Sequence, residues 1–217
     1  MYIHNISRKN SILNTFISEI RSTTIQSDRM RFRKNIERIG EVLAYEMSKY
    51  LDYKATPIKT PLGISHVNLP QNNLVLCSIL RAGVPLHNGL LNYFDTADNA
   101  FISAYRRHHH NPETIDIVIE YMASPSIEGK TLVLVDPMLA TGQSLRTAFE
   151  ALKAFGTPDN IHLVCVIGSE DGINFIRKAF PKNTHLWIAA VDPTLNDHGY
   201  IVPGLGDAGD LAFGEKL

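Results

Sequence analysis

The spacing of apolar residues divides the chain into a helical beginning and a longer region in which two periods alternate. Over residues 11–21 and 28–51 the apolar positions recur at helical spacing, which predicts two amphipathic helices. Further on, apolar β-branched runs predict strands at residues 74–80, 101–105, 115–122, 131–135, 161–167 and 185–191. Helical patterns lie between them at residues 84–94, 143–155 and 170–180. Repeated β-α-β units of this kind predict an α/β fold with an open, mostly parallel sheet flanked by helices.

Two segments lie outside this alternation. Residues 54–68 are β-prone around a Pro61–Gly63 turn, which predicts a β-hairpin arm. Residues 196–217 are rich in glycine and have no periodicity, so we expect a loop, and its apolar residues 200–203 favour an ordered functional loop over a floppy tail. We therefore expect a single domain over residues 1–217, with N-terminal helices (1–53), the arm (54–68), an α/β core (74–191) and a C-terminal segment (195–217).

Composition excludes several classes of protein. With 217 residues and 44% hydrophobic content, the chain can bury one substantial core. The 21 Lys and Arg against 22 Asp and Glu argue against a general nucleic-acid binder. The two cysteines, Cys77 and Cys165, lie in apolar runs and are expected to be buried reduced thiols. No signal-peptide core and no membrane-spanning run is present in the sequence, so we expect a cytoplasmic protein with no membrane partner.

The stretch from Val133 to Ser144 combines a buried strand, the acid Asp136, a short loop and the start of a helix. Free N–H groups at a helix N-terminus and the helix dipole make such a junction a phosphate site in open α/β sheets. Thr141 and Ser144 add hydroxyl groups, and Gly142 permits close approach of the backbone. No lysine follows the glycine, so this is not a P-loop. The alternative is that these side chains only cap the loop and the helix.

Two further loops should meet this one at the carboxyl edge of the sheet. Arg81-Ala82-Gly83 follows the first core strand, and Arg106 follows the second. An arginine beside a glycine turn can clamp phosphate oxygens, although an arginine after a strand is more often a surface residue. The run 106–110 contains three histidines and looks like a metal or nucleic-acid tract, but adjacent residues point different ways. A solvated loop with Arg106 at its start reaching the site is therefore favoured. The basic residues of helix 28–51 are likewise interpreted as a solvated face rather than an anion site.

Three segments resemble motifs of one family. Residues 136–144 resemble the phosphoribosyl-pyrophosphate (PRPP) motif of uracil phosphoribosyltransferases, a family with the type I phosphoribosyltransferase fold. Residues 195–210 resemble the uracil-binding segment of that family, and residues 79–83 are similar to its pyrophosphate loop. The order and spacing of the three segments agree as well, and the likeness extends over nearly the whole chain. The central motif indicates only PRPP binding, whereas the C-terminal segment points to uracil.

The resemblance implies that the chain converts uracil and PRPP to UMP and pyrophosphate in pyrimidine salvage. It implies the catalytic residues Asp207, Arg81 and Asp136. It implies a PRPP site of Arg81, Arg106, Asp136, Pro137, Met138, Leu139, Ala140, Thr141, Gly142, Gln143, Ser144 and Asp207. It implies a uracil site of Ile201, Gly206, Asp207 and Ala208, read largely by main-chain groups. The implied cofactor is Mg²⁺, held by Asp207 and mainly through PRPP. A base-binding hood formed by the C-terminal loop, a homodimer or higher homo-oligomer, and a possible GTP effector complete the set of expectations.

Two departures from the family pattern leave an alternative open. Gln143 stands where the family usually has glycine, which is expected to be tolerated unless that position requires a positive φ. Residues 107–126 differ from the acidic and proline-rich family pattern, and Ala123 stands at the position of a lysine. A regulatory protein that senses PRPP or a nucleotide on the same fold is the alternative to the enzyme. A transferase for another base is disfavoured by the match over residues 200–208.

Overall fold

The structure is a computed structural model that describes residues 1–71, 73–108 and 115–216. For residues 104–108 and 115–118 it describes the backbone but not the side chains. Its main sheet runs in the order β1-β10-β9-β7-β4-β5-β6, with β8 paired to β9. The strands are β1 (Tyr2–Asn5), β4 (Leu74–Leu80), β5 (Asp98–His108), β6 (Ile115–Ala123), β7 (Thr131–Val135), β8 (Met138–Leu139), β9 (Asn160–Ser169) and β10 (His185–Asp192). Every pairing is parallel except that of β5 with β6. The predicted mostly parallel α/β fold is therefore confirmed.

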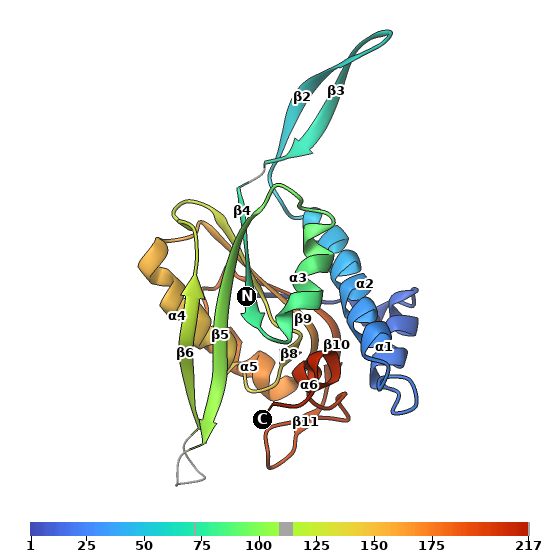
Figure 1. The fold of residues 1–217 in the computed structure, drawn as a ribbon. Helices are drawn as coiled ribbons and strands as arrows, with labels where there is room; N and C mark the ends of the chain where they lie inside the picture. The colour runs from blue at the N-terminus through green and yellow to red at the C-terminus, as the bar shows by residue number, and fades with distance from the viewer. Residues whose placement is uncertain (72, 109–114, 217) are drawn as a thin grey trace.

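Helices cover both faces of this sheet, as Figure 1 shows. One face carries α1 (Leu13–Arg21), α2 (Arg29–Ser48) and α3 (Gly83–Leu91), and the other carries α4 (Gln143–Leu152) and α5 (Glu170–Ala179). Successive strand residues point to opposite faces, so Val133 and Val135 of β7 join the first layer while Leu132 and Leu134 join the second. Burial on both faces explains why the central strands are continuous apolar runs.

Most predicted boundaries lie close to the observed ones. Helix α2 ends three residues before the predicted residue 51, after Asp28 caps its start by accepting the N–H of Arg31 at 3.0 Å. The helix predicted over 143–155 is α4 followed by the 3-10 helix η2 (Lys153–Phe155). Strand β5 is longer than predicted at both ends, because its start pairs with β4 and its end extends the antiparallel pair with β6.

The β-hairpin arm is confirmed as β2 (Tyr53–Thr60) paired with β3 (Gly63–Pro70). Figure 1 shows it standing away from the body of the protein. The expectation of a loop over residues 196–217 is wrong in part. A short pair, β11 (Thr194–Leu195) with β12 (Ile201–Val202), and the helix α6 (Ala208–Phe213) form there. The strand β1 and the 3-10 helix η1 (Ile6–Arg8) were also not predicted, since four residues on a sheet edge are too few to show a period.

The two cysteines are buried and free, as expected. Burial raises the pKa of Cys77 to about 12, and burial together with the Asp136 carboxylate raises the pKa of Cys165. Both thiols are therefore protonated and unreactive at neutral pH. Within the described ranges, none of the helices has the length and apolar character needed to cross a membrane.

Candidate active site

The loop from β7 to α4 forms a small hollow at the carboxyl edge of the sheet. Asp136 follows β7, is 9% exposed, and its Oδ1 accepts the N–H of Met138 at 3.1 Å. The hollow is lined by Asp136, Met138, Ala140, Thr141, Gly142, Ser144 and Leu145. The carboxylate shapes the turn and also borders the hollow, so the capping role considered from the sequence accompanies the site rather than replacing it.

Gly142 directly precedes helix α4 and has a left-handed backbone conformation. Its φ is +79°, and an added Cβ would lie 2.7 Å from Ile176 Cγ2 and 2.9 Å from Phe175 Cδ1. Both the backbone and the space therefore require glycine. Since glycine has no side chain to cap the helix, the N–H groups of the first turn remain available to an anion. Thr141 Oγ1 makes only a long contact of 3.4 Å with the N–H of Gln143.

The loop is held in place by the start of α5. Ser169 Oγ donates to the carbonyl oxygen of Ala140 at 2.7 Å and accepts the N–H of Gly172 at 2.8 Å. Ser169 is fully buried, so both bonds are shielded from water. The same hydroxyl thus caps one helix and fixes the loop that starts another.

The Arg81 loop follows β4, the neighbour of β7 in the sheet. The Nη2 atom of Arg81 donates to Asp210 Oδ1 at 3.1 Å and to the carbonyl oxygen of Gly214 at 3.0 Å. Its Nε atom is buried and, among the described residues, has no hydrogen-bond partner. The loop therefore lies against the C-terminal segment, more than 120 residues away in sequence.

The C-terminal segment is ordered by its own polar groups. Asp207 Oδ1 accepts the N–H groups of Gly209 at 2.8 Å and Asp210 at 3.0 Å, which caps α6. Ile201 and Ala208 are buried, whereas Gly206 is exposed and has a φ of +93°. The implied uracil residues are thus spread over β12, the turn after it and the start of α6.

Arg106 lies in β5, paired with Ile117 of β6, and its side chain falls outside the described residues. The expectation that it reaches the site stays a prediction. The interpretation of residues 106–110 as a solvated loop is wrong for Arg106, Arg107 and His108, which belong to β5. His109 and His110 lie outside the described residues. Ala123 ends β6, and Gln143 is the first residue of α4 without a positive φ.

The structure shows which of the predicted site residues lie together, and it also shows contacts of residues that the sequence analysis did not single out. Arg81 contacts the segment that contains Asp207, and one hollow is lined by Asp136, Met138, Ala140, Thr141, Gly142 and Ser144. Sequence reasoning assigned no role to Asp210 or to Arg21, which proves to be bonded to Asp192 and Gly204. No local pattern marks such pairs, because their members lie more than 120 residues apart.

Comparisons with known proteins agree with this geometry. The family model described as Uracil phosphoribosyltransferase matches residues 7–215. The uracil phosphoribosyltransferase of Porphyromonas gingivalis is 52% identical over 217 residues, covering 100% of both chains. That of Pyrococcus furiosus is 36% identical over 194 residues, covering 88% of this chain and 82% of the relative. A solved protein of Aquifex aeolicus superposes with a TM-score of 0.86 at 30% identity, covering 98% of each chain. By its sequence over nearly its whole length, this chain belongs to the uracil phosphoribosyltransferase family.

Proposed function

We propose that the protein transfers the 5-phosphoribosyl group of PRPP to uracil, giving UMP and pyrophosphate in pyrimidine salvage. The observation that carries the proposal is the contact of Arg81 with Asp210 and Gly214. This contact holds the guanidinium of Arg81, which we propose binds an anion, against the glycine-rich C-terminal segment, and Arg81 follows β4, the neighbour of β7 in the sheet. A substrate with a base at one end and phosphates at the other fits between these parts.

The loop Pro137–Ser144 is the proposed cradle of the 5′-phosphate. The first-turn N–H groups of α4, including those of Gln143 and Ser144, supply donors, and the helix dipole favours the negative charge. Asp136 borders the same hollow, so its carboxylate is placed to accept hydrogen bonds from the ribose hydroxyls. Together they hold the phosphoribosyl half of PRPP.

Arg81 and Arg106 are proposed to bind the pyrophosphate. A guanidinium offers paired donors that match phosphate oxygens, and the buried Nε of Arg81 still lacks a partner among the described residues. As pyrophosphate leaves, negative charge grows on its oxygens, and these cations stabilise it.

The donor set fits Mg²⁺ bound mainly by the substrate. Among the described residues there is no cluster of three or more metal-ligating side chains. Mg²⁺ is commonly held by one or two carboxylates together with substrate phosphates. Asp207 uses Oδ1 for both of its cap bonds, which leaves Oδ2 for the ion. When bound, the ion would neutralise charge on the pyrophosphate.

Uracil is proposed to be read by main-chain groups of Ile201, Gly206 and Ala208, beside Asp207. A pyrimidine edge alternates donors and acceptors, and a fixed backbone can match that order without the cost of ordering flexible side chains. The uracil nitrogen, held in line, forms a bond to the anomeric carbon while the bond to pyrophosphate breaks, and the proton that the nitrogen gives up leaves with the pyrophosphate. We propose no covalent enzyme intermediate.

We also propose that the hairpin arm packs on a second copy of the chain. Figure 1 shows no other element around it, and its apolar side chains are exposed, with Leu62 100% and Ile64 70% accessible. Such exposure on a projecting hairpin is typical of an interaction surface. A homodimer or larger homo-oligomer would cover it. Activation by GTP and a cytoplasmic location stay predictions.

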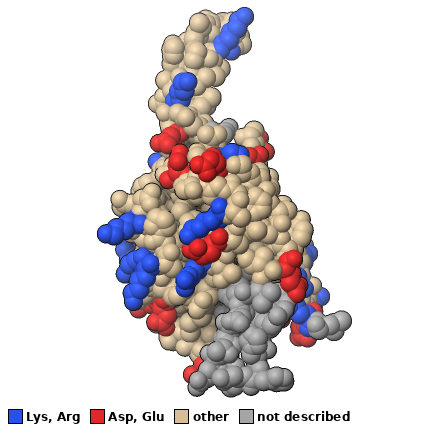
Figure 2. Space-filling model, turned by 90° about the vertical axis from the view of Figure 1, so that its left-hand side faces the viewer, with Lys and Arg blue, Asp and Glu red and all other residues tan. Residues whose placement is uncertain are grey.

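Nucleic acid is not the proposed partner. Figure 2 shows Lys and Arg side chains beside Asp and Glu side chains over the body of the protein on that face. Ion pairs of the protein include Lys130 with Asp98 at 2.7 Å and Lys153 with Glu150 at 2.8 Å. A binding face for nucleic acid would instead gather positive charge.

One assay tests the proposal against the sensor alternative. The purified chain is incubated with PRPP, Mg²⁺ and each free base in turn, while nucleotide and pyrophosphate are measured. We expect UMP and pyrophosphate in equal amounts from uracil alone. PRPP binding without formation of UMP would favour the regulatory sensor. Turnover of another base in place of uracil would show that the protein is a transferase for that base.

A further inference from the structure

Arg21 and Asp192 together hold the peptide groups of Gly204, in the middle of the C-terminal segment. Arg21 ends α1, and Asp192 ends β10. The guanidinium donates from Nη1 to Asp192 Oδ2 and from Nη2 to Oδ1, both at 2.8 Å. Nη1 also donates to the carbonyl oxygen of Gly204 at 3.0 Å, and Asp192 Oδ2 accepts the N–H of Gly204 at 3.1 Å. We call these three residues the Gly204 clamp.

The geometry points to Arg21 and Asp192 as positioning residues that set specificity and affinity for the base. This inference rests on the proposed role of residues 201–208 in binding uracil. Main-chain groups can discriminate one base from another only if the backbone that carries them is fixed. Gly204 lies between Ile201 and Gly206, so fixing both of its polar groups fixes the path of the chain between two of the proposed reading positions.

The Gly204 clamp is largely withdrawn from solvent, unlike a surface ion pair. The side chains of Arg21 and Asp192 are 22% and 7% exposed, and Gly204 is buried. A bidentate pair that is mostly withdrawn from water is stronger and more directional than an exposed pair. Gly204 has a φ of +58°, and an added Cβ would lie 2.0 Å from the carbonyl oxygen of Ile201. Both the backbone conformation and the space at this position therefore require glycine, and the clamp restrains the flexible backbone that glycine brings.

Neighbouring contacts extend the same support. With its amide nitrogen turned to donate, Gln26 reaches the carbonyl oxygens of Leu205 at 2.9 Å and Ile20 at 3.0 Å. Arg33 of α2 donates from Nη1 to the carbonyl oxygen of Ala212 at 2.7 Å, near the end of α6. The N-terminal helices and the loop between them thus contact the C-terminal segment at Gly204 and Leu205, between the proposed reading positions, and at Ala212, after them.

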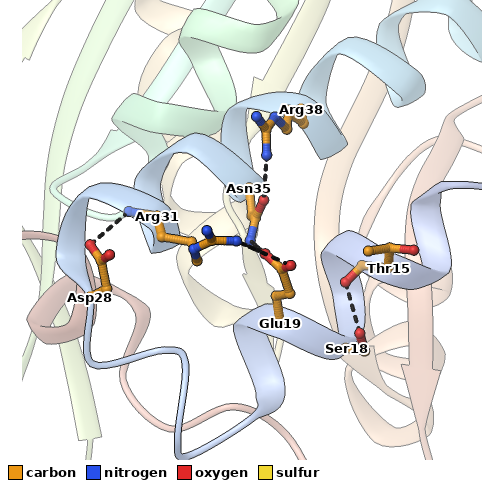
Figure 3. Close-up of polar contacts among 7 residues, drawn as sticks. All are labelled: Thr15, Ser18, Glu19, Asp28, Arg31, Asn35 and Arg38. Carbon is orange, nitrogen blue, oxygen red and sulfur yellow. Dashed lines mark hydrogen bonds and ion pairs between the residues drawn. The ribbon is translucent and has the colours of Figure 1, made fainter.

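Helix α1 is itself fixed on α2 by a polar network, shown in Figure 3. Asn35 is 1% exposed and donates from Nδ2 to Glu19 Oε2 at 2.7 Å, while Arg31 Nη1 reaches the same carboxylate at 3.1 Å. Arg31 contacts neither Asp192 nor Gly204, according to the interactions of the described residues. It therefore provides a matched control: an arginine on the same helix pair whose loss breaks an ion pair outside the clamp.

The experiment compares Arg21→Ala, Arg21→Lys and Arg31→Ala by steady-state kinetics with uracil and PRPP varied separately. For Arg21→Ala we expect KM for uracil to rise about tenfold while KM for PRPP changes less than about threefold, as the loss of one charged hydrogen bond would give. Arg21→Lys should recover part of the affinity, since one donor remains. Arg31→Ala leaves the bond of the buried Asn35 to Glu19 in place, so α1 keeps its position and both KM values should match the wild type.

Gly206→Ala tests whether the C-terminal segment binds uracil, separately from whether the Gly204 clamp positions that segment. If it raises KM for uracil and Arg21→Ala does not, the clamp has no positioning role and the inference is overturned. If Gly206→Ala leaves KM for uracil unchanged, the assignment of the segment to the base is overturned instead. Equal rises in both KM values for Arg21→Ala, or a loss of thermal stability with unchanged KM, would also overturn the inference by indicating a merely structural contact.

Discussion

The guanidinium of Arg81 lies 3.1 Å from the carboxylate of Asp210, measured from Nη2 to Oδ1. This ion pair joins the loop after β4 to the helix α6. Arg81 is also the proposed pyrophosphate ligand, so Asp210 and the substrate compete for one cation. Binding of pyrophosphate and the position of the C-terminal segment should therefore be coupled.

Asp210→Asn is expected to strengthen binding of pyrophosphate. The side chains of the pair are 39% and 35% exposed, and exposed pairs contribute about 0.2–1 kcal/mol, so the affinity should rise by no more than about fivefold. Calorimetry with pyrophosphate and Mg²⁺ measures this directly. Weaker binding by Asp210→Asn would show that the carboxylate supports the substrate site instead of competing for Arg81.

Asp207→Asn should reduce turnover while leaving the fold intact. Asparagine caps helices about as well as aspartate, so the bonds to Gly209 and Asp210 persist and the free energy of unfolding should change by less than about 0.5 kcal/mol. Loss of the carboxylate should lower kcat by about 100-fold if it acts on PRPP and Mg²⁺. Asp207→Ala is the companion variant and should also lose about 1 kcal/mol of stability with the cap. Near-normal turnover by Asp207→Asn would remove this residue from the site.

Substitution of Gly142 should weaken PRPP binding, whereas substitution of Gln143 should not. Gly142→Ala forces a Cβ into a left-handed position 2.7 Å from Ile176, so we expect a stability loss of about 1–3 kcal/mol and weaker binding of PRPP. Gln143→Gly retains the peptide N–H and should change KM for PRPP less than about twofold, while costing about 0.5–1 kcal/mol of helix stability. Chemical denaturation and PRPP kinetics measure both quantities. A large change in KM for Gln143→Gly would mean that the glutamine side chain itself contributes to the site.

The histidines at the N-terminal edge of the sheet should make stability depend on pH. Burial, then the nearby His185 and His4, lowers the pKa of His162 from 6.5 to about 3, and burial also lowers the pKa of His4 and of His185. The unfolded chain therefore binds protons that the folded chain does not. For His162, the contribution to stability is fully present above pH 6.5 and is lost as the pH falls toward 3, by up to about 1.4 kcal/mol per pH unit.

Denaturation curves collected between pH 7 and 4 test this dependence. His162→Asn keeps an acceptor for Trp187 Nε1, which donates to His162 Nδ1 at 2.9 Å, but removes the titrating group. Its stability should fall less steeply with acid than that of the wild type. His66→Asn, on the exposed hairpin, is the control and should keep the wild-type slope. Identical slopes for all three proteins would exclude His162 as the source.

The sequence by itself determined the layers of the fold and the central loop. Runs such as Val133–Val135 are apolar on both sides because both sheet faces are covered, so an unbroken apolar run of this length indicates a buried parallel strand. Asp136 to Ser144 are adjacent in sequence, and a strand followed by a glycine and a helix can form a phosphate cradle from local geometry alone. The resemblance over residues 195–210 added the base to this prediction.

Only the tertiary structure decided which distant residues meet. The short helix α6 has no apolar period of its own and forms where Asp207 caps it and α2 packs against it. Arg21, Asp192 and Gly204 come from a helix end, a strand end and a turn, and each is unremarkable in its own sequence context. Their contacts arise because the carboxyl end of β10 and the N-terminal helices converge on the C-terminal segment. Pairings at such separations depend on how whole elements pack, which local spacing does not encode.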